Sequence, residues 1–162
     1  MPEDTVDEYL TFSLGEEEYA IDILRVREIR SWEAVTRIPF AESWECGLVN
    51  VRGAIVPVVD LRRRLGLADT TFDKHTVVIL VGRREGERDK VSGLVVDQLN
   101  GVIAAGRTAI QDAPHFKSRV DMRYVAGLTE SDGRMIILLN LDTLLNASGE
   151  VPGTAELEGE QA

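Results

Sequence analysis

One arginine stands where a turn residue is expected. In the stretch "NVRG" (residues 50–53), Arg52 precedes Gly53 between two runs of β-branched apolar residues, a pattern that predicts strand, tight turn and strand. Asn or Asp is favoured before a hairpin glycine, because a short polar side chain tolerates a positive φ. Either Arg52 is an exposed, tolerated turn residue, or its guanidinium is held on a rigid turn to pair with a partner's carboxylate, a role its planar donors suit.

A second pair of residues raises a related question. In "RVREIRSW" (25–32), Val26 and Glu28 lie two positions apart, so on a regular strand they face the same way. An apolar residue and an acid on one face indicate a half-buried edge or a docking surface; an ordinary solvated strand face is the alternative.

The sequence offers no comparable set of residues for catalysis. It lacks the G-x-S-x-G nucleophile motif and the glycine-rich phosphate-binding motifs. His75 and His115 have no Cys or His at metal-ligand spacing, and the single Cys46 is interpreted as a small buried hydrophobe. We therefore expect a protein that is not an enzyme and holds no cofactor and no metal.

Composition narrows the class of partners. The chain has 162 residues and a net charge of −10, which argues against nucleic acid and against direct contact with an anionic membrane surface. Its apolar runs are far shorter than the roughly 20 residues that span a bilayer, and its acidic N-terminus does not resemble a secretory signal. A lone cysteine allows no internal disulfide, so we expect a reducing cytoplasm.

The elements that must position these residues are predicted to be strands. Val, Ile, Tyr, Phe and Thr dominate short apolar segments between turn signals. No long stripe of helical period is present, so a helix bundle is disfavoured. The predicted strands are 9–14, 18–21, 25–32, 34–38, 47–51, 54–60, 75–81, 90–96, 99–105, 125–131 and 134–140.

The chain also contains an internal repeat. Residues 46–66 align without gaps with 126–146, and Arg52 falls on Asp132 of "SDGRM", the residue that a hairpin turn prefers. Each repeat has about five strands and a short terminal helix, so a mainly β fold of two small five-stranded barrels with a groove between them is expected. We predict one domain over 8–148, divided into a first subdomain (about 15–70) and a second (about 8–14 and 71–148). An acidic disordered tail is predicted over 149–162.

Several of these segments resemble one family. "FSLGEEEYAIDILRVREI", "GLVNVRGAIVPVVDLRRRLGL" and "TVVILV…VSGLVVDQL" are similar to the bacterial chemotaxis coupling protein family, CheW, and the resemblance covers about residues 9–146. It implies two five-stranded SH3-like β-barrels. It also implies a non-catalytic cytoplasmic adaptor that links the hairpin tips of chemoreceptors to the histidine kinase CheA, with further assembly into rings.

The resemblance assigns roles to individual positions. The groove between the barrels would receive the receptor, through Val26, Glu28, Arg52, Gly93, Leu99 and Val102. Ile38 and Phe116 would contact the CheW-like regulatory domain of CheA. The segment "IQDAPHF" departs from the family pattern at Gln111, which stands where the family commonly has a basic residue.

Two alternatives to a chemotaxis adaptor stay open. A CheW-type scaffold of a non-flagellar chemosensory pathway would have the same motifs. A small barrel that binds a ligand would need convergent polar groups in a pocket, and the sequence singles out no such set.

Overall fold

The computed structural model describes residues 6–32, 45–67, 72–85, 87–112 and 121–149. The first half of the chain contributes β1 (Val6–Leu14), β2 (Glu17–Asp22), the 3-10 turn η2 (Ile23–Arg25), β3 (Val26–Ser31), β4 (Glu45–Val51), β5 (Ala54–Asp60) and α1 (Leu61–Arg64). The second half contributes β6 (Val77–Glu85), β7 (Arg88–Val96), β8 (Gln98–Gly106), η3 (Arg107–Ala109), η4 (Met122–Tyr124), β9 (Val125–Ser131), β10 (Arg134–Leu139) and α2 (Leu141–Gly149).

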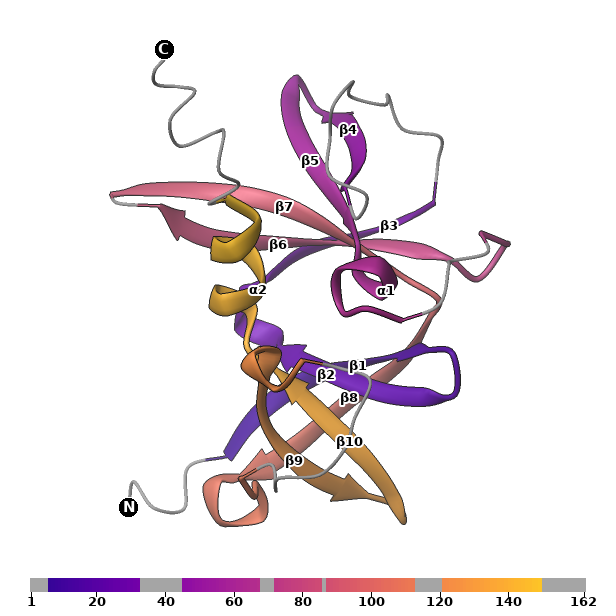
Figure 1. The fold of residues 1–162 in the computed structure, drawn as a ribbon, viewed down its shortest axis with the longest axis vertical. Helices are drawn as coiled ribbons and strands as arrows, with labels where there is room; N and C mark the ends of the chain where they lie inside the picture. Colours follow the sequence, from indigo (N-terminus) through magenta and orange to yellow (C-terminus); the bar gives the residue numbers. More distant parts are fainter. Residues whose placement is uncertain (1–5, 33–44, 68–71, 86, 113–120, 150–162) are drawn as a thin grey trace.

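The strands form two five-stranded sheets, which confirms the mainly β fold predicted from the sequence. The first sheet has the order β8-β1-β2-β10-β9 and the second has the order β3-β6-β7-β5-β4. Figure 1 shows the second sheet above the first, with α1 between them. Of the remaining predictions, the strand at 34–38 lies outside the described residues, as does the tail beyond Gly149.

The two repeats exchange strands. Each sheet takes its central hairpin from one repeat, β1–β2 or β6–β7, and its other three strands from the other repeat. The predicted subdomain boundaries were therefore wrong. A boundary at residue 15 would divide the β1–β2 hairpin, and residues 77–96 belong to the second sheet, with β3, β4 and β5. Tight hairpins keep neighbouring strands in one sheet, and the chain changes sheets only at the links that follow the two central hairpins, β2–β3 and β7–β8.

The registers make the two sheets closely equivalent. Val58 of β5 pairs in parallel with Gly93, and Leu138 of β10 pairs in the same way with Ala20. Each outer strand that follows a central hairpin also carries a bulge. On β3, Val26 and Ile29 pair with Val81 and Ile79; on β8, Leu99 and Val102 pair with Phe12 and Leu10. Leu99 therefore corresponds to Val26, and Val102 to Ile29.

The main core lies between the two sheets. It contains side chains of both, such as Phe12, Tyr19, Ile79 and Leu94, together with the leucines of α1 and α2. Each sheet also curves around a small apolar cluster of its own, centred on Val58 in the second sheet and on Ile136 in the first. Burial of one aliphatic or aromatic side chain contributes about 1.5–3 kcal/mol to the stability of the fold. Because both sheets contribute side chains to this one core, the shared core couples the stability of the two sheets.

Both repeats place a left-handed residue before the hairpin glycine. Arg52 has φ +52° and Gly53 has φ +89°, while Asp132 and Gly133 have +54° and +76°. Two consecutive positive φ values are characteristic of the two-residue turn whose twist matches that of its strands. The predicted turns are confirmed, and Arg52 adopts the conformation that usually favours a shorter side chain.

Candidate functional site

Arg52 meets Glu28 on the surface of the second sheet. Arg52 Nη2 donates to Glu28 Oε1 at 2.6 Å, and Arg30 Nη1 donates to Glu28 Oε2 at 3.2 Å. The contact joins the β4–β5 hairpin to β3, which are at opposite edges of the sheet's strand order. The two charged residues singled out in the sequence are therefore partners within the chain, and their contact bridges the two edges of the curved sheet.

The electrostatics of this cluster leave an excess of positive charge. The hydrogen bond from Arg52 lowers the pKa of the Glu28 carboxyl, helped by the charges of Arg52 and Arg30 and opposed by partial desolvation. Glu28 in turn raises the pKa of Arg52. Two guanidiniums surround one carboxylate, and the Arg52 side chain is 72% exposed. The arrangement can accept a further carboxylate from a binding partner.

The hairpin that presents Arg52 is fixed by a side-chain contact of its own. The Gly53 N–H donates to Asn50 Oδ1 at 2.9 Å across the turn. This bond and the paired strands β4 and β5 restrict the direction in which the arginine leaves the sheet. An ordered base of this kind reduces the entropy lost when the guanidinium binds a partner.

Val26 and Glu28 do not face the same way, contrary to the sequence prediction. The bulge in β3 lies between them, so Val26 pairs with Val81 and Glu28 pairs with Leu80. Cross-strand partners share a face of the sheet. Val26 therefore packs against the main core beside Val81, while Glu28 lies on the face of Leu80, which belongs to the second sheet's own cluster.

Leu99 and Val102 share the intersheet face of β8. Leu99 packs against the main core, and Val102 is 53% exposed. Their equivalents on β3 are Val26, also packed against the core, and Ile29, which is 42% exposed. Ile29 belongs with this apolar set but was missed from the sequence, because only the bulge brings it onto the same face as Val26.

Gly93 lies in the interior rather than on this surface. It is buried in β7, and a Cβ atom at this position would lie 2.9 Å from Val78 Cγ1. Val58 and Leu80 bound the same space, so the absence of a side chain allows the strands of the second sheet to pack closely. Gly93 can therefore affect a binding surface only through the packing beneath it.

Two of the predicted site residues, Ile38 and Phe116, lie outside the residues that the structure describes.

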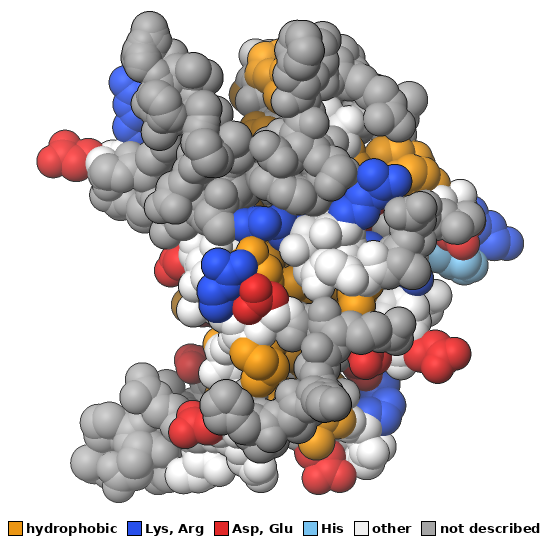
Figure 2. Space-filling view, in the orientation of Figure 1, with side chains coloured by type: hydrophobic (Ala, Val, Ile, Leu, Met, Phe, Trp, Pro, Cys, Tyr) orange, Lys and Arg blue, Asp and Glu red, His pale blue; other side chains and the backbone are white. Residues whose placement is uncertain are grey.

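Within the described part of the chain, no group of three or more metal-ligating side chains is present. None of the helices described is both long and apolar enough to cross a bilayer. On the face in Figure 2, acidic and basic side chains of the coloured residues are interspersed, with no broad patch of one sign.

Several known proteins resemble this chain over all or part of its length. The model of the CheW-like domain family matches residues 8–149. The chemotaxis protein CheW of Klebsiella aerogenes is 40% identical over 140 residues, which cover 86% of this chain and 82% of the relative. The crystal structure of the scaffolding protein TtCheW from Thermoanaerobacter tengcongensis superposes with a TM-score of 0.79 at 32% identity, covering 92% of this chain and 91% of that one. Protein PilI of Pseudomonas aeruginosa is 29% identical over 91 residues, 56% of this chain and 49% of its own.

Proposed function

The chain belongs to the CheW-like domain family, and from this premise we propose that it is a non-catalytic chemotaxis adaptor. It links the cytoplasmic hairpin tips of chemoreceptors to the regulatory domain of the histidine kinase CheA, in cytoplasmic arrays recruited to the receptors. The observation that carries the proposal is the family match over residues 8–149, which takes in strands of both sheets.

The receptor-binding surface combines a charged cluster with apolar edge strands. A receptor hairpin tip is helical, and helices bind through apolar side chains at positions three and four apart, with polar contacts at the margin. Val102 and Ile29 offer exposed apolar area on β8 and β3, above Leu99 and Val26. Arg52, with Glu28 at its side, offers the polar contact. Gly93 supports the surface from below by close packing.

The kinase-binding surface is proposed from the family resemblance alone. Ile38 and Phe116 occupy the matching positions of the motifs "VTRIP" and "APHF". Through these residues the chain would contact the CheW-like domain of CheA and take part in rings.

Co-purification and a receptor pull-down test the two halves of the proposal. We expect the chain to co-purify with the CheA regulatory domain and to be recovered with receptor arrays. Arg52→Glu should lose receptor recovery and keep CheA binding, because it places a carboxylate beside Glu28. Arg52→Asn, which suits the turn, is the matched control for the backbone. Unchanged receptor recovery with Arg52→Glu would reject the receptor site, and absent CheA binding would reject the adaptor.

A scaffold of another chemosensory pathway is the second candidate. The partial similarity to PilI favours it, although the match covers about half of each chain. The same co-purification distinguishes the two when the kinase regulatory domains of the different chemosensory systems of the host are offered in competition. Preferential recovery of a kinase from a non-flagellar system would assign the chain to that pathway.

A further inference from the structure

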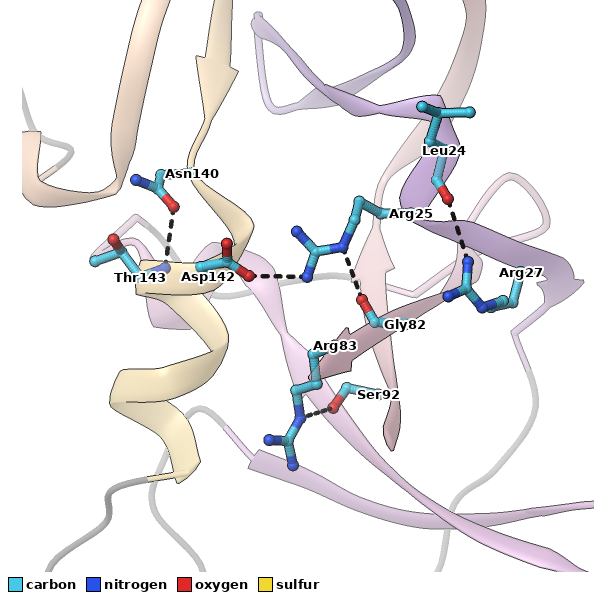
Figure 3. A network of polar contacts seen from close by, with 9 residues as sticks. All are labelled: Leu24, Arg25, Arg27, Gly82, Arg83, Ser92, Asn140, Asp142 and Thr143. Atoms are coloured by element: carbon cyan, nitrogen blue, oxygen red, sulfur yellow. Dashed lines mark hydrogen bonds and ion pairs between the residues drawn. The ribbon is translucent and has the colours of Figure 1, made fainter. Parts of the chain in front are cut away.

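Two sets of polar contacts lie where the chain passes from one sheet to the other. The chain crosses from the first sheet to the second between β2 and β3, and returns between β7 and β8. At the first crossing, Arg25 Nη2 donates to Asp142 Oδ1 of α2 at 2.9 Å, and Arg25 Nε donates to the Gly82 carbonyl at 2.9 Å. Figure 3 shows Arg25 between α2 and the strand that carries Gly82.

The second crossing is held in the same way with the charges reversed. Asp97 is the single residue between β7 and β8. Its Oδ2 accepts from Arg62 Nη2 of α1 at 2.9 Å and from the Gly15 N–H at 2.7 Å. The Arg62 and Asp97 side chains are only 18% and 23% exposed, so solvent screens this pair less than most surface pairs. We call the Arg25–Asp142 and Arg62–Asp97 contacts the crossing ion pairs.

The helical residues of the two crossing ion pairs are related by the internal repeat, whereas Arg25 and Asp97 differ by one position in the register that makes Val26 equivalent to Leu99. Arg62 and Asp142 are each the second residue of a helix, α1 or α2, that begins with a buried leucine. The repeat alignment places them at equivalent positions. The first repeat thus carries arginine both at its crossing and on its helix, and the second repeat carries aspartate at both. Each crossing contacts the helix of the opposite repeat, so unlike charges always meet.

We propose that this reversal of charge selects pairing of the first repeat with the second over pairing of two identical repeats from different chains. In an assembly of two first repeats with the same strand exchange, Arg25 of one chain would meet Arg62 of the other. In an assembly of two second repeats, Asp97 would meet Asp142. Like charges brought together at these contacts disfavour the wrong partner, more strongly at Arg62, whose side chain is 18% exposed, than at Asp142, whose side chain is 68% exposed.

Such competition follows from the topology. β1 and β2 cannot complete their sheet until β8, β9 and β10 have been synthesised. During this interval, a first repeat on another chain offers equivalent strands, and exchange of equivalent elements is a common route to dimers. The similar apolar patterns of the two repeats do little to distinguish the right partner from the wrong one, whereas the crossing ion pairs do.

Charge swaps in the full-length chain test this inference. The variant Arg62→Asp with Asp97→Arg retains opposite charges within the native pair but places arginine at both crossings and aspartate on both helices. Identical repeats are then complementary. The matched control adds Arg25→Asp with Asp142→Arg, which reverses both pairs and restores the difference between the repeats. Each protein is refolded from urea at a series of concentrations, and its mass is measured by size-exclusion chromatography with light scattering.

We expect the double variant to give a species of twice the wild-type mass, in a proportion that rises with refolding concentration. The fourfold variant should return to the wild-type mass, although it loses the backbone contacts at both crossings and melts at a lower temperature. If the double variant keeps the wild-type mass throughout the series, or if the fourfold variant doubles in mass equally, the inference is wrong. Should the double variant not refold, the reciprocal double variant, Arg25→Asp with Asp142→Arg, provides the same comparison.

Discussion

Arg52 supplies a charge that its turn does not require. Its backbone is left-handed, with φ +52°, and the equivalent position in the other repeat holds the better-suited Asp132 at +54°. The guanidinium instead contacts Glu28, which is already bonded to Arg30. Arginine is not a residue that this left-handed turn favours, and we propose that it stands here because its guanidinium can bind a carboxylate of the receptor as well as Glu28.

The titration of Glu28 reports directly on this contact. Because Arg52 lowers the pKa of Glu28 below its ordinary value of 4.5, Arg52→Asn should raise that pKa toward the ordinary value. A lowered folded-state pKa means that the contact contributes to stability above the ordinary pKa. That contribution is lost as the pH falls through the folded-state value. A carboxyl-detected NMR titration of the two proteins measures the shift.

Arg30 provides the control for this titration. Its charge and hydrogen bond affect the Glu28 pKa less than those of Arg52. Arg30→Gln should therefore raise the pKa by a smaller amount than Arg52→Asn. An equal or larger shift in the Arg30 variant would show that Arg52 is not the dominant partner of Glu28 in solution.

At the scale of the elements, strand positions could be predicted from the sequence, but strand registers could not. Alternation of β-branched residues and turn signals located β1–β10 closely, and the repeat identified the exceptional turn at Arg52. The faces of Val26 and Glu28 were predicted from a period of two, which the bulge in β3 interrupts. A bulge depends on hydrogen bonding to the neighbouring strand, and nothing in "RVREI" itself indicates where that strand lies.

Gly93 tests whether packing within an element supports the surface above it. Gly93→Ala would bring a Cβ to 2.9 Å from Val78 Cγ1. Overpacking of this kind costs about 1–3 kcal/mol, and each kcal/mol lowers the melting temperature by roughly 2–4 °C for a chain of this size. Thermal unfolding followed by circular dichroism measures the loss.

A double-mutant cycle separates packing from a direct surface role. Val78→Ala removes the methyl group that the new Cβ would meet. The double variant Gly93→Ala with Val78→Ala should therefore lose less stability than the sum of the two single variants. If Gly93→Ala abolishes receptor recovery while leaving the melting temperature unchanged, Gly93 contacts the partner directly, and our account of it is wrong.

At the scale of the whole molecule, the internal repeat could be predicted from the sequence, but the exchange of strands between the two repeats could not. Two similar repeats are equally compatible with each repeat closing on itself. The deciding detail is the link between β7 and β8, which is Asp97 alone. In this strand order β6 and β5 occupy the two sides of β7. To stay in the same sheet, β8 would have to lie beyond one of them, at about 10 Å from β7. Two residue steps reach only roughly 7 Å, so the chain must enter the other sheet.

Strand exchange makes each half of the chain dependent on the other. Residues 1–70 carry β1–β5 and α1, but neither sheet is complete without β6–β10, and the main core takes side chains from both halves. We therefore expect residues 1–70 and 71–162, expressed separately, to show no cooperative thermal transition. Mixed together, they should form a one-to-one complex with the circular dichroism spectrum of the intact chain. A cooperative transition in a monomeric fragment would mean that a repeat can close on itself, which would contradict the interdependence of the two sheets. A cooperative transition in a dimeric fragment would mean that two identical repeats pair, which would contradict the charge selection.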